Sequence, residues 1–99
     1  MNQFIDKAKE TMDEIFNLIE SKYDNFEVDF EDENLRIDSV ANNNVFIVSI
    51  HSPTSQIWLS SPISGAHHFK MSSSSPITWQ STRDKDINLL DLLISELEK

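Results

Sequence analysis

The chain has 99 residues and no cysteine, which excludes disulfides, thiolate metal sites and cysteine nucleophiles. Its 17 acidic and 8 basic side chains give a net charge of −9, a field that repels nucleic acid and anionic membranes and attracts cations or basic protein surfaces. No stretch approaches the roughly 20 apolar residues of a membrane span. The length predicts one domain over residues 1–99, with enough apolar residues for a modest core.

The negative charge is concentrated at one end of the chain. Residues 1–33 hold eleven acidic and three basic side chains, a net of −8, whereas residues 34–99 hold six and five, a net of −1. Acidity often serves only to keep a protein dispersed in water, and that is the simplest interpretation of the composition. Its confinement to the first third favours an acidic surface with a function of its own.

Residues 4–23 are predicted to form an amphipathic helix, because apolar residues recur three and four positions apart on one face. Carboxylates occupy the opposite face, with Glu14 at its margin: Asp6, Glu10, Asp13, Glu20 and Asp24. Like charges at this spacing destabilise a helix by roughly 0.2–0.5 kcal/mol per pair. A face selected only for contact with water would more often intersperse lysines.

An antiparallel sheet of five or six strands is predicted to follow. Residues 26–31 alternate strictly between apolar and acidic, so Glu27, Asp29 and Glu31 point outward. The other strands are predicted at 35–40, 45–50, 56–60, 66–71 and 76–80, with turns at 42–44 and 61–65, a break at Pro53, a polar loop at 72–75 and a linker at 83–87.

A second amphipathic helix is predicted over residues 88–97, where Asn88 is a candidate N-cap with Asp91 three residues on. The order helix, strands, helix predicts an α+β two-layer sandwich with both helices packed on one face of the sheet. The acidic helix and the acidic strand would then present one continuous acidic ridge if they lie side by side.

The two tryptophans are predicted to face opposite ways. Alternation places Trp58 beside Gln56 and Ser60, on the face opposite Ile57 and Leu59, whereas Trp79 is expected to point inward. A strand Trp is ordinarily part of the core. Trp58, among polar neighbours, is either exposed or covered by residues from elsewhere in the chain, and an exposed Trp of this kind is typical of a protein-binding surface.

No catalytic motif is present, since there is no glycine-rich phosphate loop and no Gly-x-Ser-x-Gly elbow. His67 and His68 are adjacent in a strand, so their rings point to opposite faces and cannot chelate one ion together. A surface or packing role is the more common one for such histidines, and a pairing of His51 or His68 with a carboxylate across the sheet stays open.

The carboxylates are the remaining candidates for a metal site, because oxygen ligands suit hard cations, including ferrous and ferric iron. An open row of them predicts weak, salt-sensitive binding.

The segment Gln56-Ile57-Trp58-Leu59-Ser60-Ser61-Pro62-Ile63-Ser64-Gly65 resembles the signature strand and turn of the frataxin family. The resemblance extends over nearly the whole chain, with an acidic first helix and strand, Trp79 on a late strand and a Leu-rich terminal helix around Asp91-Leu92-Leu93. Without a recognisable presequence the chain is similar to the bacterial CyaY type, so a cytoplasmic location is expected. The family usually has an Asn-basic-Gln run before the proline, where this chain has Ser49-Ile50-His51.

The resemblance implies a role in iron–sulfur cluster assembly, with weak iron binding on the acidic ridge and contacts to a cysteine desulfurase and its scaffold protein. By position, the implied iron-binding residues are Glu10, Asp13, Glu14, Glu20, Asp24, Glu27, Asp29 and Glu31. The implied partner-binding residues are Gln56, Trp58, Ser60 and His68. A monomer is expected, with an iron-dependent oligomer as the alternative.

Three functions are compatible with these observations. The first is an iron-responsive regulator or adaptor of cluster assembly. The second is an iron-storing or ferrous-iron-oxidising protein, which ranks lower because ferroxidase chemistry usually needs two metals held by shared ligands on facing helices. The third is an acidic binding module or inhibitor that mimics nucleic acid, a function that neither Trp58 nor the confinement of charge to the first third requires. No catalytic residue is identified.

Overall fold

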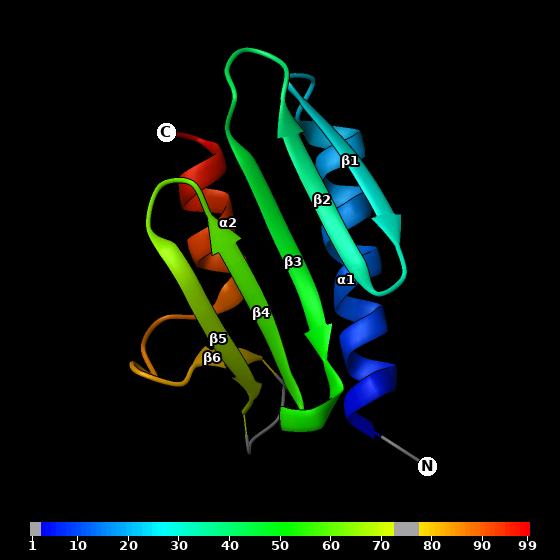
Figure 1. Ribbon diagram of the computed structural model, residues 1–99, viewed down its shortest axis with the longest axis vertical. Helices are drawn as coiled ribbons and strands as arrows, with labels where there is room; N and C mark the ends of the chain where they lie inside the picture. Colours follow the sequence, from blue (N-terminus) through cyan, green and yellow to red (C-terminus); the bar gives the residue numbers. More distant parts are fainter. Residues whose placement is uncertain (1–2, 73–77) are drawn as a thin grey trace.

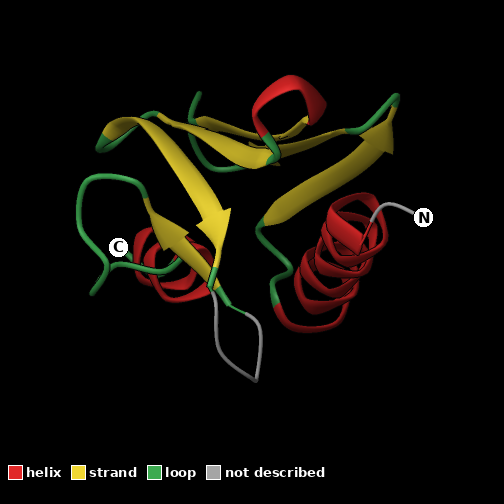
Figure 2. Ribbon diagram, turned by 90° about the horizontal axis from the view of Figure 1, so that it is seen from below, coloured by secondary structure: helices red, strands yellow, loops and turns green. Residues whose placement is uncertain are grey.

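The computed structural model describes residues 3–72 and 78–99. The elements, in chain order, are α1 (Gln3–Lys22), β1 (Phe26–Glu31), β2 (Asn34–Ser39), β3 (Val45–His51), a 3-10 turn (Ser52–Thr54), β4 (Gln56–Ser61), β5 (Gly65–Met71), β6 (Trp79–Ser81) and α2 (Leu89–Leu97). The six strands form one antiparallel sheet in sequential order, and both helices cover the same face of it (Figures 1 and 2). The predicted α+β two-layer sandwich is confirmed, with six strands.

Most predicted boundaries agree with the observed ones to within one or two residues. The strand expected at 76–80 is observed as β6, which begins at Trp79. Residues 73–77 lie outside the described part of the chain, and they include most of the predicted loop at 72–75 and the start of that predicted strand. Neither described helix is both long and apolar enough to cross a membrane.

The core lies between the sheet and the two helices. Every second residue of β3 and β4 is buried there, which leaves Gln56, Trp58 and Ser60 on the opposite, outer face of the sheet. The largest fully buried side chains come from both layers: Phe46, Phe69, Met12, Ile15, Ile19, Leu35, Ile37, Ile57, Leu59, Leu89, Leu93 and Val48. A one-residue slip in register would move these side chains into water, so the hydrophobic pattern specifies which face each site residue occupies.

Trp79 joins the short edge strand β6 to helix α1. Its side chain is 5% exposed, and its ring meets the Phe4 ring edge-on with the centroids 5.8 Å apart. Its Nε1–H donates to Thr11 Oγ1 at 2.7 Å, and the Thr11 hydroxyl donates in turn to the Lys7 carbonyl oxygen at 2.9 Å. A buried indole needs an acceptor for its N–H, and α1 supplies one. The inward position predicted for Trp79 is confirmed.

Helix α2 is held at its start and near its end. Asn88 is the N-cap, as predicted, because its side-chain Oδ1 accepts from the Asp91 backbone N–H at 2.9 Å. Near the other end the Glu96 carboxylate, only 4% exposed, accepts from the Ser61 hydroxyl at 2.6 Å. Ser61 Oγ also accepts from the backbone N–H groups of Ile63 and Ser64. One hydroxyl therefore ties the turn after β4 to α2.

The ends of the two helices are connected through Tyr23 and Glu98. The phenol hydroxyl donates to Glu98 Oε2 at 2.6 Å. This hydrogen bond, with a smaller contribution from burial and from the carboxylate's charge, raises the pKa of Tyr23 from 10.0 to about 12. Since the folded-state pKa lies above the unfolded one, the stabilisation is fully present below pH ~10 and is lost as the pH rises through ~12.

A pH titration of Tyr23 tests this connection, because it is the only tyrosine in the chain and its ionisation can be followed by tyrosinate absorbance. We expect ionisation near pH 12 in the wild type and near pH ~10 in Glu98→Ala, which lacks the acceptor. Far-ultraviolet circular dichroism at each pH reports whether the chain is still folded. Wild-type ionisation near pH ~10 in the folded protein would show that the hydrogen bond does not persist in solution.

Candidate functional site

The carboxylates of β1 form the first of three acidic groups. Phe26, Val28 and Phe30 are half-buried toward the core, so the alternate residues Glu27, Asp29 and Glu31 are exposed on the outer face of the sheet. We call these three residues the β1 group. Across the strand pair, Asp29 lies opposite Arg36. A hydrogen bond to Asp38, together with the charges of Asp38 and Asp29, raises the pKa of Arg36, whose cation partly offsets the group's charge.

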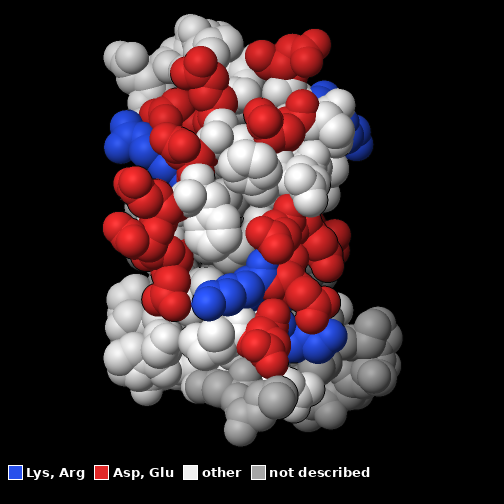
Figure 3. All heavy atoms as spheres, turned by 90° about the vertical axis from the view of Figure 1, so that its right-hand side faces the viewer, with Lys and Arg blue, Asp and Glu red and all other residues white. Residues whose placement is uncertain are grey.

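The second acidic group projects from helix α1 and the turn that follows it. It consists of Asp13, Glu20 and Asp24, which are all exposed, and we call it the α1 group. Figure 3 shows the acidic side chains of this edge as two columns, with uncharged side chains between them along most of their length. The arrangement follows from the sequence, because the apolar stripe of α1 turns its acidic face outward beside β1.

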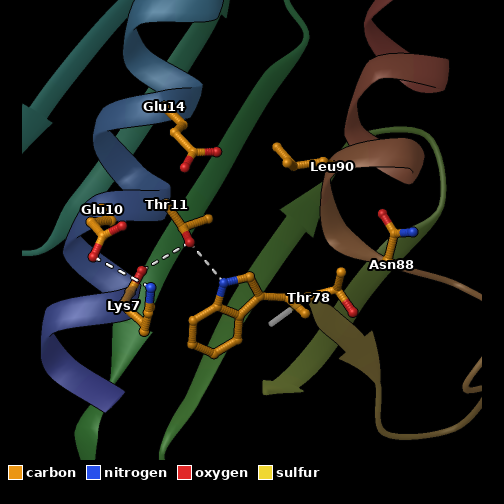
Figure 4. Close-up of a pocket in the computed structure, with 8 residues that line it drawn as sticks. Lys7, Glu10, Thr11, Glu14, Thr78, Asn88 and Leu90 are labelled. Atoms are coloured by element: carbon orange, nitrogen blue, oxygen red, sulfur yellow. Dashed lines mark hydrogen bonds and ion pairs between the residues drawn. The ribbon is translucent and has the colours of Figure 1, made fainter. Parts of the chain in front are cut away.

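The third group lies at a cavity. Glu10 and Glu14 line a cavity of about 120 Å³ between α1 and α2, together with Thr11, Trp79 and Asn88 (Figure 4). Glu10 Oε2 lies 3.7 Å from Lys7 Nζ. Both carboxylates line this cavity, whereas none of the β1 group does. We call them the groove pair.

The structure thus places the carboxylates of the predicted ridge in the β1 group, the α1 group and the groove pair, and the single ridge stays a prediction. Helical periodicity placed Glu14 at the margin of the acidic face of α1. In the structure one side of α1 packs against β1, and Glu14 lines the cavity between α1 and α2. Within residues 3–72 and 78–99, no three His, Cys, Asp or Glu side chains are arranged to hold one metal ion. The carboxylates of the three groups are hard oxygen donors, which suit iron, and each would contact an ion separately at the surface.

Trp58, on the outer face of the sheet, is sandwiched between two histidines. The His51 ring lies 3.8 Å from the indole, centroid to centroid, at 16°, and the His68 ring lies 4.4 Å away on the other side at 22°. The Trp58 Nε1–H donates to Gln56 Oε1 at 2.8 Å, and His51 Nδ1 lies 2.7 Å from Thr54 Oγ1. We call His51, Trp58 and His68 the aromatic stack.

The stack corrects the expectation of an exposed Trp58. The residue is half-buried, and of the two alternatives left open by its polar neighbours, the structure shows cover by residues from adjacent strands. His51 was not among the predicted site residues. Its place follows from the pairing of His51 with Gln56 across β3 and β4, which sets it diagonally beside Trp58. The sequence left open a pairing of His51 or His68 with a carboxylate, and in the structure both imidazole rings stack on the indole of Trp58.

His67, the neighbour of His68, lies on the opposite face of β5. Its Nε2 is 2.8 Å from Ser64 Oγ, and its ring stacks on that of Phe69, a core residue. The predicted opposition of the two adjacent histidines is confirmed. Of the remaining predicted partner-binding residues, Ser60 is exposed and Gln56 is half-buried, both on the outer face with Trp58.

Comparison with known proteins finds frataxins among the similar sequences and structures. The chain is 46% identical, over 54 residues, to the mitochondrial frataxin homolog of Schizosaccharomyces pombe, an alignment that covers 54% of this chain and 33% of the relative. The chain thus spans about a third of the length of that relative.

Two solved structures resemble the fold of this chain. A frataxin of the CyaY family from Psychromonas ingrahamii has a TM-score of 0.84 at 22% identity, with 98% of this chain and 89% of that chain covered. A trimeric frataxin from Saccharomyces cerevisiae, complexed with ferrous iron, has a TM-score of 0.73 at 25% identity, with 99% and 84% covered.

A family model described as a frataxin-like domain matches residues 1–99. The match spans both helices, the six strands and the turn in which Ser61 is tied to Glu96. Because the family model covers the whole sequence and the fold of solved frataxins covers nearly all of it, this chain belongs to the frataxin family.

Proposed function

We propose that this chain, as one domain over residues 1–99, is an iron-binding regulator or adaptor of a cysteine desulfurase–scaffold complex in iron–sulfur cluster assembly. The frataxin family is associated with iron and with cluster assembly, and the solved yeast relative is complexed with ferrous iron. The observation that carries the proposal is the segregation of charge. The exposed β1 and α1 groups occupy one edge of the molecule (Figure 3), whereas the sequence of residues 45–71 contains no Asp or Glu at all.

The acidic edge would act by electrostatic docking. Exposed carboxylates on neighbouring elements attract a basic patch on a partner and raise the association rate, an effect that salt screens. Iron that binds weakly to the same carboxylates offsets their charge and competes with the basic patch. Docking would then respond to the iron level, although no carboxylate group is required to hold iron tightly.

The outer face of the sheet would provide the second contact, to the scaffold. Trp58 is central on this face, with Gln56, Ser60 and His68 around it. Because His51 and His68 cover both ring faces, the partner would meet the edge of the indole and the flanking imidazoles. Half-buried aromatic residues in such settings commonly carry much of the binding energy of an interface.

The test is binding of the cognate desulfurase–scaffold complex at low and moderate salt, with and without ferrous iron. Charge reversal is applied group by group, as Asp13/Glu20/Asp24→Lys, Glu27/Asp29/Glu31→Lys and Glu10/Glu14→Lys, alongside Trp58→Ala. The matched control, Asp84/Asp86→Lys, reverses two exposed charges in the linker before α2.

We expect wild-type binding to weaken with salt, and each of the two three-residue reversals to weaken it at least about ten-fold, since rim charges chiefly affect association. The control is expected to bind like the wild type. Equal losses in all reversals would show that net charge matters and its position does not. No binding under any condition would rule out the adaptor role, and faster ferrous-iron oxidation by the protein would then favour an iron-oxidising or iron-storing protein.

Two further properties belong to the proposal. We propose a monomer in the cytoplasm, and the trimeric yeast relative makes oligomer formation on iron addition the alternative. Sedimentation velocity with and without ferrous iron separates these states, because a trimer would sediment as a distinctly faster species.

A further inference from the structure

The outer face of strands β3, β4 and β5 has a charge character opposite to that of the acidic edge. Residues 45–71 contain no carboxylate, and their ionisable side chains are three histidines and Lys70. Strand register places His51, His68 and Lys70 on the outer face, while His67 faces the core side. In a chain of net charge −9, this face is the one built of neutral and basic groups.

We infer that this face binds a carboxylate-bearing segment of a partner, seated across the aromatic stack, and that protonation of His51 and His68 strengthens the binding. The inference rests on the proposed function, because it specifies the chemistry of the partner segment that meets Trp58. It also predicts that binding of the partner segment depends on pH, which docking through the acidic edge does not explain.

Protonation is compatible with the stacked geometry. The faces of an indole carry negative electrostatic potential, so a cationic imidazolium above and below the Trp58 ring is favourable. Both rings lie nearly parallel to the indole at contact distance, at 3.8 and 4.4 Å between centroids. An ordinary histidine gains its charge as the pH falls through about 6.5, within the range cells experience. Two protonated imidazoles on this face would add their charges to that of Lys70.

The charged groups around the stack are few. On β2 the Arg36 guanidinium is hydrogen-bonded to Asp38, so this pair contributes little net charge. On β6, the neutral Gln80 lies opposite Lys70 of β5. In the turn after β1, the Glu33 carbonyl oxygen accepts from the Ile50 N–H at 3.1 Å, which brings Glu33 and Asp32 to the end of β3 that carries His51. His68 and Lys70 lie on β5, on the other side of Trp58 from His51.

Charge also argues against other occupants. A basic segment would be repelled by Lys70 and attracted to the acidic edge. An apolar segment finds little to cover, because the exposed large hydrophobic residues of the described chain are Val40 and Ile63, both in connections between strands. An acidic segment is the occupant that matches the groups on this face.

The experiment uses a poly-glutamate peptide as the probe, titrated into ¹⁵N-labelled full-length protein at about pH 5.5 and about pH 8, on either side of the ordinary histidine pKa. A poly-lysine peptide is titrated in parallel. We expect poly-glutamate to shift amide resonances of β3–β5 and to bind roughly three- to ten-fold more tightly at the lower pH, as two exposed charge pairs allow. Poly-lysine is expected to shift α1 and β1 instead.

The variants assign the pH dependence to the stack. His51→Asn/His68→Asn should bind poly-glutamate equally at both pH values, whereas His67→Asn, altered at the adjacent position on the other face, should keep the wild-type dependence. Poly-glutamate shifts that map outside β3–β5, or a pH dependence that survives in His51→Asn/His68→Asn, would overturn the inference. Its failure is distinguishable from failure of the proposed function. The peptide titration does not involve the desulfurase complex, and Glu27→Gln/Asp29→Asn/Glu31→Gln, which removes the β1 charges without adding a basic site, should still bind poly-glutamate with the same pH dependence.

Discussion

Replacement of Trp79 by alanine is expected to lower the free energy of unfolding by about 3–5 kcal/mol, the usual loss for truncation of a buried Trp. The side chain is 5% exposed, packs edge-on against Phe4 and donates to Thr11 Oγ1 at 2.7 Å. Its removal leaves a cavity at the point where the short strand β6 meets α1. For a domain of this size, total stability is about 5–15 kcal/mol, so the loss is a large fraction of it.

Urea denaturation followed by circular dichroism measures this effect, and two variants divide it. Trp79→Phe keeps an aromatic ring but lacks the indole N–H, and we expect a loss of about 1–2 kcal/mol for the hydrogen bond and the smaller ring. Trp58→Ala is the matched control on the outer face, where loss of ring stacking is expected to cost about 1 kcal/mol. Equal losses in Trp79→Ala and Trp58→Ala would contradict the assignment of Trp79 to the core.

Replacement of Glu96 by alanine is expected to lower the free energy of unfolding by about 1.5–3 kcal/mol, the value typical of a hydrogen bond to a charged group. The carboxylate is 4% exposed and accepts from Ser61 Oγ at 2.6 Å. The Ser61 oxygen already accepts from two backbone N–H groups of the following turn, so without Glu96 its hydroxyl hydrogen has no partner at that site. Helix α2 and the turn after β4 should loosen together.

A double-mutant cycle with Ser61→Ala checks this prediction, again by urea denaturation. If the two side chains act through each other, the losses in Glu96→Ala and Ser61→Ala are not additive, and the double variant loses less than the sum of the single ones. Glu96→Gln keeps an acceptor of the same shape and should lose less than Glu96→Ala. Strict additivity in the cycle would show that the hydrogen bond contributes nothing to stability.

The strands and helices could be predicted because each depends on a local pattern. The apolar stripe of residues 4–23, the alternation of residues 26–31 and the cap at Asn88 each bury or satisfy groups within one element, and all three are observed. The alternation around Trp58 also placed it correctly on the outer face. The face that a residue occupies does not specify which side chains it contacts, and two of the three residues of the aromatic stack come from strands other than that of Trp58.

The sequence by itself determined the family, the fold class and the excess of negative charge in the first third of the chain. These are properties of composition, periodicity and one signature segment, which do not require knowledge of contacts between distant residues. Only the tertiary structure showed how the carboxylates divide, because Glu10 and Glu14 line the cavity between α1 and α2, whereas the exposed Asp13 and Glu20 do not. It likewise decided that His51 and His68 enclose Trp58, since strand register is what sets side chains from three strands ring against ring.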